Sequence, residues 1–108
     1  MNILSFINEK EIVCPLPKKW DELWKLMLKT ALPKESKGLV TSQIFERFNL
    51  KPPLILGSWY FESDDAKRLR FEEQITWAKE KGILDVVENF IQELNEKDFH
   101  YFSGKGEF

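Results

Sequence analysis

The sequence predicts an all-α protein, an irregular bundle of four to five helices with an extended N-terminal arm. Apolar residues recur at spacings of three and four along several segments, which is the pattern of helices with one buried face. Proline and glycine follow several of these segments, at positions where helices commonly end. The predicted helices span residues 18–31, 41–48, 53–61, 64–81 and 83–95.

The apolar residues before the first predicted helix alternate poorly with polar ones. We expect residues 1–14 to form an extended arm or short strand that docks its apolar side chains on the helices. Pro17 suits the first turn of a helix, because its fixed φ is helical and it has no N–H to leave unpaired. From residue 18 to 31, one helical face gathers Trp20, Leu23, Trp24, Met27, Leu28 and Ala31.

The middle of the chain leaves two assignments open. Thr41 or Ser42 can cap a short helix over residues 41–48. The apolar run 53–61 is short enough for a buried strand or a buried helix, and the prolines at its start favour a helix. The alternative fold is α+β, in which the N-terminal arm and residues 54–60 form a small two-stranded sheet.

The longest predicted helix, residues 64–81, is apolar on two sides. Ser63 is a good N-cap and Gly82 a good left-handed terminator. The apolar residues form two stripes about 160° apart, with Phe71, Ile75 and Ala78 on one and Ala66, Leu69 and Trp77 on the other. Such a helix lies between two neighbours, or it buries one side and offers the other to a partner. The helix over residues 83–95 has a single apolar stripe.

A chain of 108 residues corresponds to one domain, residues 1–108, since domains cluster at about 100–150 residues. It contains nine Phe, four Trp and two Tyr. Because aromatic side chains carry large apolar areas, a few bulky residues build this core, or some of them lie on a contact surface. Residues 97–108 are an aromatic tail that we expect to be partly disordered.

The charge balance and the cysteine content restrict the partner and the compartment. A net charge of −2 argues against a nucleic-acid binder, which normally presents a basic surface. A single cysteine cannot form an intramolecular disulfide. The N-terminal segment lacks the positive charge of a signal peptide, and no window is long and apolar enough for a transmembrane helix. We therefore expect a cytoplasmic protein with no membrane partner.

His100 and Cys14 are the residues from which a catalytic hypothesis would start. Asp98 is too close in sequence to orient His100, and no nucleophile is tied to the histidine. Cys14 stands outside any CxxC motif or helix N-terminus that would make a thiol reactive. The two residues supply only two ligands, fewer than a zinc site uses. We expect no catalysis, no metal and no cofactor.

The aromatic content and the two-sided helix favour a protein-interaction module, such as an adaptor, an inhibitor or a regulatory subunit. Its partner is another protein or a second copy of the chain in a homodimer. Trp, Tyr and Arg are frequent in interface hot spots. The candidate interface residues are Leu69, Arg70 and Trp77 on the 64–81 helix and Phe99, Tyr101 and Phe102 in the tail.

Two other functions fit the sequence less well. The polar side of the 41–48 helix and the basic cluster Lys67–Arg70 could contact nucleic acid, although acidic neighbours offset the cluster. The other of these two functions is the binding of a small molecule in a pocket between the aromatic helices.

Overall fold

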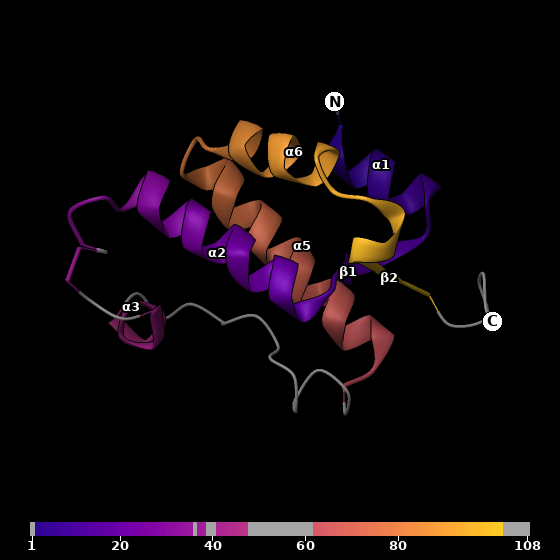
Figure 1. Ribbon diagram of the computed structural model, residues 1–108, viewed down its shortest axis with the longest axis horizontal. Coiled ribbons are helices and arrows are strands. Elements are labelled where there is room, and N and C mark those ends of the chain that lie inside the picture. The colour runs from indigo at the N-terminus through magenta and orange to yellow at the C-terminus, as the bar shows by residue number, and fades with distance from the viewer. Residues whose placement is uncertain (1, 36, 39–40, 48–61, 103–108) are drawn as a thin grey trace.

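The computed structural model describes residues 2–35, 37–38, 41–47 and 62–102. These residues contain five α-helices, one 3₁₀ turn and two short strands (Figure 1). The elements are α1 (Ile3–Glu9), β1 (Ile12–Pro15), α2 (Pro17–Ala31), α3 (Thr41–Arg47), α5 (Asp64–Glu80), α6 (Leu84–Gln92), η1 (Glu96–Asp98) and β2 (Phe99–Tyr101). The mostly helical fold is confirmed. The helix expected over residues 53–61 lies outside the described residues.

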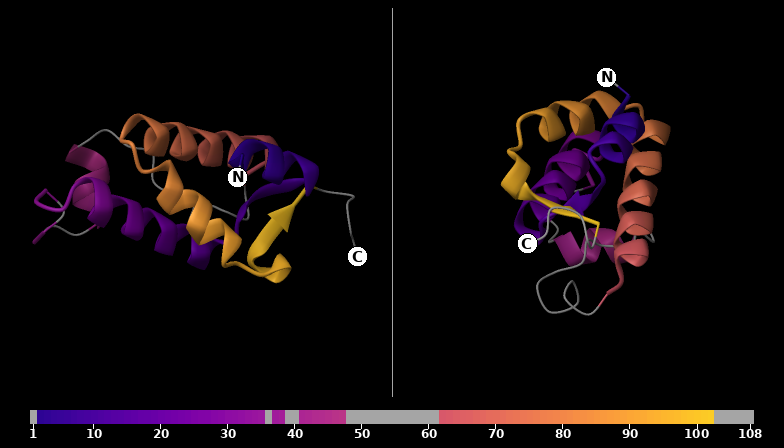
Figure 2. Two further views of the ribbon diagram at one scale, coloured as in Figure 1. Left: turned by 90° about the horizontal axis from the view of Figure 1, so that it is seen from above. Right: turned by 90° about the vertical axis from the view of Figure 1, so that its right-hand side faces the viewer.

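The apolar face of α2 forms the centre of the core. Of the residues predicted on this face, Ala31 is half-buried, and the others are buried: Trp20, Leu23, Trp24, Met27 and Leu28. The rings of Trp20 and Phe71 meet edge to face, with 6.1 Å between their centroids. The ring centroids of Trp24 and Trp77 are 5.4 Å apart. Large aromatic side chains therefore hold α2 and α5 side by side. In the view from above, α6 crosses obliquely over this pair (Figure 2).

The expectation of an extended N-terminal arm is wrong for its first part, which is the helix α1. The side-chain oxygen of Asn2 accepts a hydrogen bond from the Ser5 N–H at 3.1 Å, so Asn2 caps the helix. Ile3 and Ile7 then lie one turn apart on one face, and both are buried. The Asn2 cap and the buried pair Ile3 and Ile7 therefore stabilise a helix in a segment that was expected to be extended.

The two strands form an antiparallel pair near the two ends of the described chain. β1 pairs with β2, with Cys14 opposite His100. Backbone hydrogen bonds from Leu16 to Asp98 and from Phe102 to Glu11 extend the pairing at both ends. The small two-stranded sheet of the alternative fold is thus present, but β1 pairs with part of the aromatic tail. Residues 54–60, the strand partner expected from the sequence, lie outside the described residues, as do residues 103–108 of the tail.

The helix α5 begins and ends where local signals predict. The Ser63 hydroxyl accepts from the Ala66 N–H at 3.1 Å, and Gly82 has φ 74° directly after the helix. The predicted core stripe of Phe71, Ile75 and Ala78 is buried. The next helix, α6, ends at Gln92, three residues before its predicted end.

The second stripe of α5 is divided between the core and the surface. Trp77 packs against Trp24, whereas the Leu69 side chain is 55% exposed. On this second side of α5, Trp77 and Ala66 are therefore half-buried and Leu69 is exposed.

Candidate binding surface

An apolar pocket of about 550 Å³ lies where α1 and α6 meet the two strands. Most of its walls are apolar, and its polar groups come from Lys10, Glu96 and Tyr101. Its lining residues are Phe6, Lys10, Ile12, Leu94, Glu96, Phe99 and Tyr101. We call it the β2 pocket.

The strand β2 directs two aromatic residues into the β2 pocket. Phe99 and Tyr101 are two positions apart, so they lie on the same side of the strand, with His100 on the other. Their rings make an edge contact with 6.4 Å between centroids, and the Tyr101 hydroxyl donates to the Glu96 carbonyl at 3.0 Å. Burial, together with the nearby Glu96 carboxylate, raises the pKa of Tyr101 above its ordinary value of 10.0. The hydroxyl is thus held neutral and donating at the wall of the pocket.

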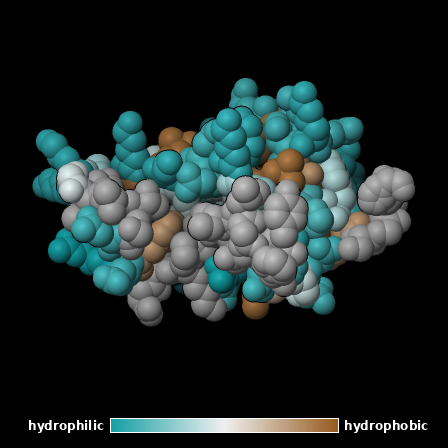
Figure 3. All heavy atoms as spheres, turned by 60° about the horizontal axis from the view of Figure 1, so that its bottom comes forward, coloured by the Kyte–Doolittle hydropathy of each residue, from teal (hydrophilic) through white to brown (hydrophobic). Residues whose placement is uncertain are grey.

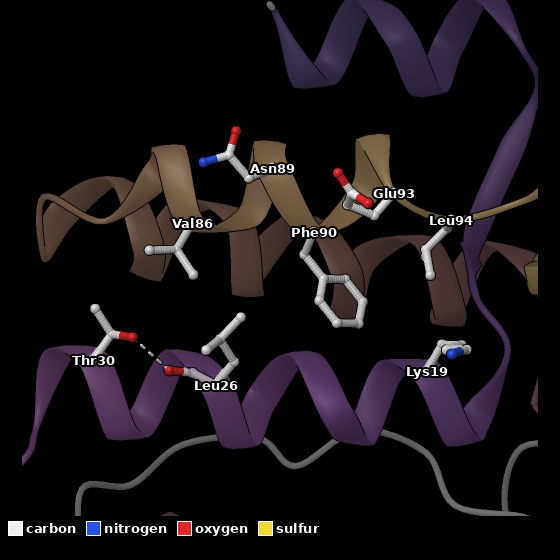
Figure 4. Close-up of a pocket in the computed structure, with 8 residues that line it drawn as sticks. All are labelled: Lys19, Leu26, Thr30, Val86, Asn89, Phe90, Glu93 and Leu94. Carbon is white, nitrogen blue, oxygen red and sulfur yellow. Dashed lines mark hydrogen bonds between the residues drawn. The ribbon is translucent and has the colours of Figure 1, made fainter.

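A second hollow, of about 500 Å³, runs between α2 and α6 (Figure 4). The α2 helix contributes Lys19, Leu26 and Thr30, and the α6 side contributes Val86, Asn89, Phe90, Glu93 and Leu94. Thr30 lies beside Val86 at one end, and Lys19 lies beside Leu94 at the other (Figure 4). Leu26 is 40% exposed at this hollow. We call this hollow the α2/α6 groove.

Leu94 lines both hollows, so the β2 pocket and the α2/α6 groove adjoin just beyond the C-terminal end of α6. They bring apolar side chains from α1, α2, α6 and β2 to one region. On the face drawn in Figure 3, the coloured hydrophobic residues form small patches that border hydrophilic ones. A run of adjoining apolar hollows has the character of a contact surface.

The structure does not bring the six candidate interface residues together. Phe99 and Tyr101 line the β2 pocket, but Phe102 lies beneath the guanidinium of Arg68, 4.9 Å from its ring centroid. Trp77 is half-buried on α5, with the Lys81 ammonium 5.7 Å from its ring. On the same helix Leu69 is exposed and Arg70 is half-buried.

Phe6 and Leu94 also line the β2 pocket, although the sequence pattern did not indicate either as a contact residue. Phe6 belongs to the segment expected to be extended, and Leu94 belongs to the apolar stripe expected to face the core. Only the pairing of β1 with β2 brings them beside Phe99 and Tyr101. The local signal for Phe6 was the Asn2 cap, which would have indicated a helix over this segment.

Most of the basic cluster Lys67–Arg70 is directed into the protein. Lys67 is only 5% exposed. Arg68 donates to the Asn8 side chain at 2.8 Å and to the Ile12 carbonyl, and it lies 3.6 Å from the Glu72 carboxylate. These contacts anchor α5 to α1 and β1. They leave little free positive charge for the phosphates of a nucleic acid.

The partner of His100 is Asp64, a residue that the sequence analysis did not connect with the histidine. His100 Nε2 and Asp64 Oδ1 are 2.8 Å apart, which connects β2 to the first turn of α5. Cys14 lies opposite His100 in the sheet, but its side chain is fully buried. Because a catalytic thiolate must reach its substrate, a buried Cys14 fits a role in packing better than one in nucleophilic catalysis.

Among residues 2–35, 37–38, 41–47 and 62–102, no three His, Cys, Asp or Glu side chains are grouped as metal ligands. Within those same ranges, no helix has the length and apolar character needed to cross a bilayer. No family model matches the chain, and no curated protein or solved structure is significantly similar to it.

Proposed function

We propose that this protein is a small cytoplasmic protein-interaction module with no catalytic activity of its own. The observation that supports the proposal is the β2 pocket. There, two of the interface residues expected from the sequence, Phe99 and Tyr101, meet Phe6 and Leu94 around a hollow of about 550 Å³. A pocket with aromatic walls is the kind of site that holds an anchoring side chain of a partner protein.

The chemistry of the β2 pocket fits an apolar anchor with polar surroundings. Its walls of Phe6, Ile12 and Leu94 favour an aliphatic or aromatic side chain, because burying that side chain removes apolar area from water. Lys10 and Glu96 line the same pocket and provide one positive and one negative charge. Polar groups of the partner that surround its apolar anchor can pair with these charges. The partner we propose is therefore a protein segment that presents one large apolar side chain among polar residues.

Photo-crosslinking tests this proposal at the pocket itself. A photoreactive phenylalanine analogue replaces Tyr101 in one version of the protein and Leu69 in another. Position 69 is exposed on α5, outside the pocket lining. We expect a specific crosslinked protein from position 101 and none from position 69. If position 101 captures nothing that position 69 does not, the β2 pocket is not an interaction site.

A pair of alanine variants on α1 provides the matched control. Phe6→Ala removes a wall of the β2 pocket, whereas Leu4→Ala removes a leucine that is 44% exposed and outside its lining. Phe6→Ala should weaken capture of the partner by roughly tenfold or more, as expected for loss of a hot-spot contact. Leu4→Ala should leave capture unchanged. Thermal unfolding of both variants separates weakened binding from weakened folding.

A second candidate function, small-molecule binding, concerns the same pocket. Its volume falls in the range of about 300–1,000 Å³ that is usual for ligand sites, and it combines apolar walls with the hydroxyl of Tyr101. Screening small aromatic and aliphatic compounds for a rise in melting temperature tests this candidate. A compound that raises the melting temperature of the wild type but not of Phe6→Ala would favour a ligand site over a protein interface.

A further inference from the structure

The two sides of the α2/α6 groove carry opposite charges. Lys19 lines the groove from α2, and helical spacing places the exposed Lys18, Lys29 and Glu22 on the solvent side of it, with Glu22 3.7 Å from Lys19. The corresponding side of α6 presents Asp85, Asn89 and Glu93, all exposed, and no basic residue. One side is therefore basic and the other acidic, and half-buried apolar side chains lie between them.

We infer that a second copy of this chain covers the α2/α6 groove. A surface with a basic side, an apolar centre and an acidic side is complementary to itself, which is the requirement of a two-fold symmetric dimer interface. In that arrangement the Leu26, Val86 and Phe90 side chains of both copies come together at the centre. The inference goes beyond the proposed function, because it concerns a different surface and does not depend on what the β2 pocket binds.

The charges also select the direction of the two-fold axis. With the axis along the groove, α2 of each copy lies over α6 of the other, and basic sides face acidic sides. With the axis across the groove, α2 lies over α2, and lysines face lysines. Like charges in close contact oppose association. The structure thus favours the axis along the groove.

An axis along the groove pairs particular residues of the two copies. The helices run in opposite directions, with Lys19 at the Leu94 end and Thr30 at the Val86 end (Figure 4). A rotation about the axis keeps each residue at its level along the groove. Lys19 of one copy therefore faces Glu93 of the other, and Lys29 faces Asp85. Two ion pairs at each end thus surround the apolar centre.

Analytical ultracentrifugation of the full chain over a range of concentrations tests the dimer. We expect reversible self-association in the wild type. Leu26→Glu should abolish it, because this substitution places two carboxylates at the apolar centre. Leu69→Glu is the matched control, since Leu69 is also an exposed leucine within a helix but lies away from the groove, and its association should equal that of the wild type.

Charge reversal at Lys29 and Asp85 tests the pairing without touching the apolar centre. Lys29→Glu alone and Asp85→Lys alone should each weaken the dimer on the order of tenfold, because each creates two like-charge contacts. A mixture of the two variants should associate better than either alone, since each contact between positions 29 and 85 in the mixed dimer again joins a carboxylate to an ammonium. Both positions are exposed, so both variants should fold as the wild type does.

Three results would overturn the inference. The first is a wild-type protein that stays monomeric up to about 1 mM, a concentration at which even a weak dimer is populated. The second is a dimer broken by Leu69→Glu and not by Leu26→Glu, which would move the interface to α5. The third is a Lys29→Glu variant that dimerises more strongly than the wild type. This result would indicate an axis across the groove, in which position 29 faces lysines of the other copy. None of these results alters the crosslinking expected at the β2 pocket.

Discussion

At the scale of single residues, Gln74 is a polar side chain buried in the core between α5 and α2. It is 1% exposed, its side-chain carbonyl accepts from the Trp20 indole N–H, and its amide donates to the Met27 sulfur at 3.1 Å. Gln74→Leu should destabilise the protein by about 1–3 kcal/mol, because the buried indole N–H loses its acceptor. Urea denaturation measures this loss.

The indole hydrogen bond can be separated from packing by a second substitution. In a Trp20→Phe background there is no indole N–H, so Gln74→Leu should cost less free energy of unfolding than in the wild type. Equal costs in both backgrounds would show that the hydrogen bond contributes nothing. The same surroundings explain why a glutamine occurs among the core residues of α5.

Tyr101 makes stability depend on pH in the alkaline range. Its pKa is raised by burial and then by Glu96, so the folded protein holds the phenolic proton more tightly than the unfolded chain. The resulting stability is fully present below the unfolded value of about 10 and is lost as the pH rises through the higher folded pKa. The wild type should therefore lose stability relative to Tyr101→Phe above about pH 10.

Thermal unfolding of the wild type and of Tyr101→Phe at several pH values between about 8 and 11 measures this difference. The phenylalanine variant keeps the ring at the β2 pocket but cannot titrate. A stability difference between the two proteins that stays constant across the whole range would mean that Tyr101 titrates normally.

At the scale of the elements, Gly82 sets the boundary between α5 and α6. Its φ of 74° lies in the left-handed region, and a Cβ at this position would meet nothing within 4 Å. Gly82→Ala should therefore cost about 1 kcal/mol from backbone conformation alone. Glu80→Ala, an exposed substitution in the last turn of α5, should change stability by less than about 0.5 kcal/mol. Equal midpoints of urea denaturation for the two variants would argue against a left-handed backbone at position 82.

The helices were the elements that the sequence could predict, because their signals are local. Trp20, Leu23 and Met27 mark the buried face of α2 by spacing alone, and Ser63 and Gly82 delimit α5 by their own chemistry. The first helix was missed because its apolar run is short and the Asn2 cap was not recognised. The end of α6 was placed three residues late, since Leu94 continues the apolar stripe beyond the helix.

The sheet and the candidate site could not be predicted in the same way. No property of residues 12–15 identifies residues 99–101 as their partner, since the pairing joins segments from the two ends of the described chain. The aromatic character of Phe99 and Tyr101 indicated contact residues, but their pocket also needs Phe6 and Leu94 from other elements. Likewise, the Asp64 partner of His100 is a long-range contact with no local signal.

At the scale of the whole molecule, β2 holds the N-terminal and C-terminal parts together. It covers β1, whose residues Ile12, Val13 and Cys14 are buried, and it carries His100 to Asp64. A chain that ends after Asp98 should lose these contacts and melt more than about 10 °C lower than the wild type, as expected when several kcal/mol are removed. Circular dichroism during heating measures the change.

A chain that ends after Phe102 is the control for this truncation. It keeps the whole of β2 and the contact between Phe102 and Arg68, and we expect it to melt close to the wild type. If both truncated chains melt together near the wild-type temperature, the strand pair does not stabilise the molecule.

The late position of β2 also has a consequence for synthesis. While the ribosome makes the chain, β1 emerges early, and its partner leaves the exit tunnel only after α2, α5 and α6 have been translated. At about 5–20 residues per second, this delay is on the order of ten seconds. During that interval the nascent chain exposes an unpaired apolar strand, which is the kind of segment that chaperones bind. The native fold is therefore completed only when Tyr101 has cleared the tunnel.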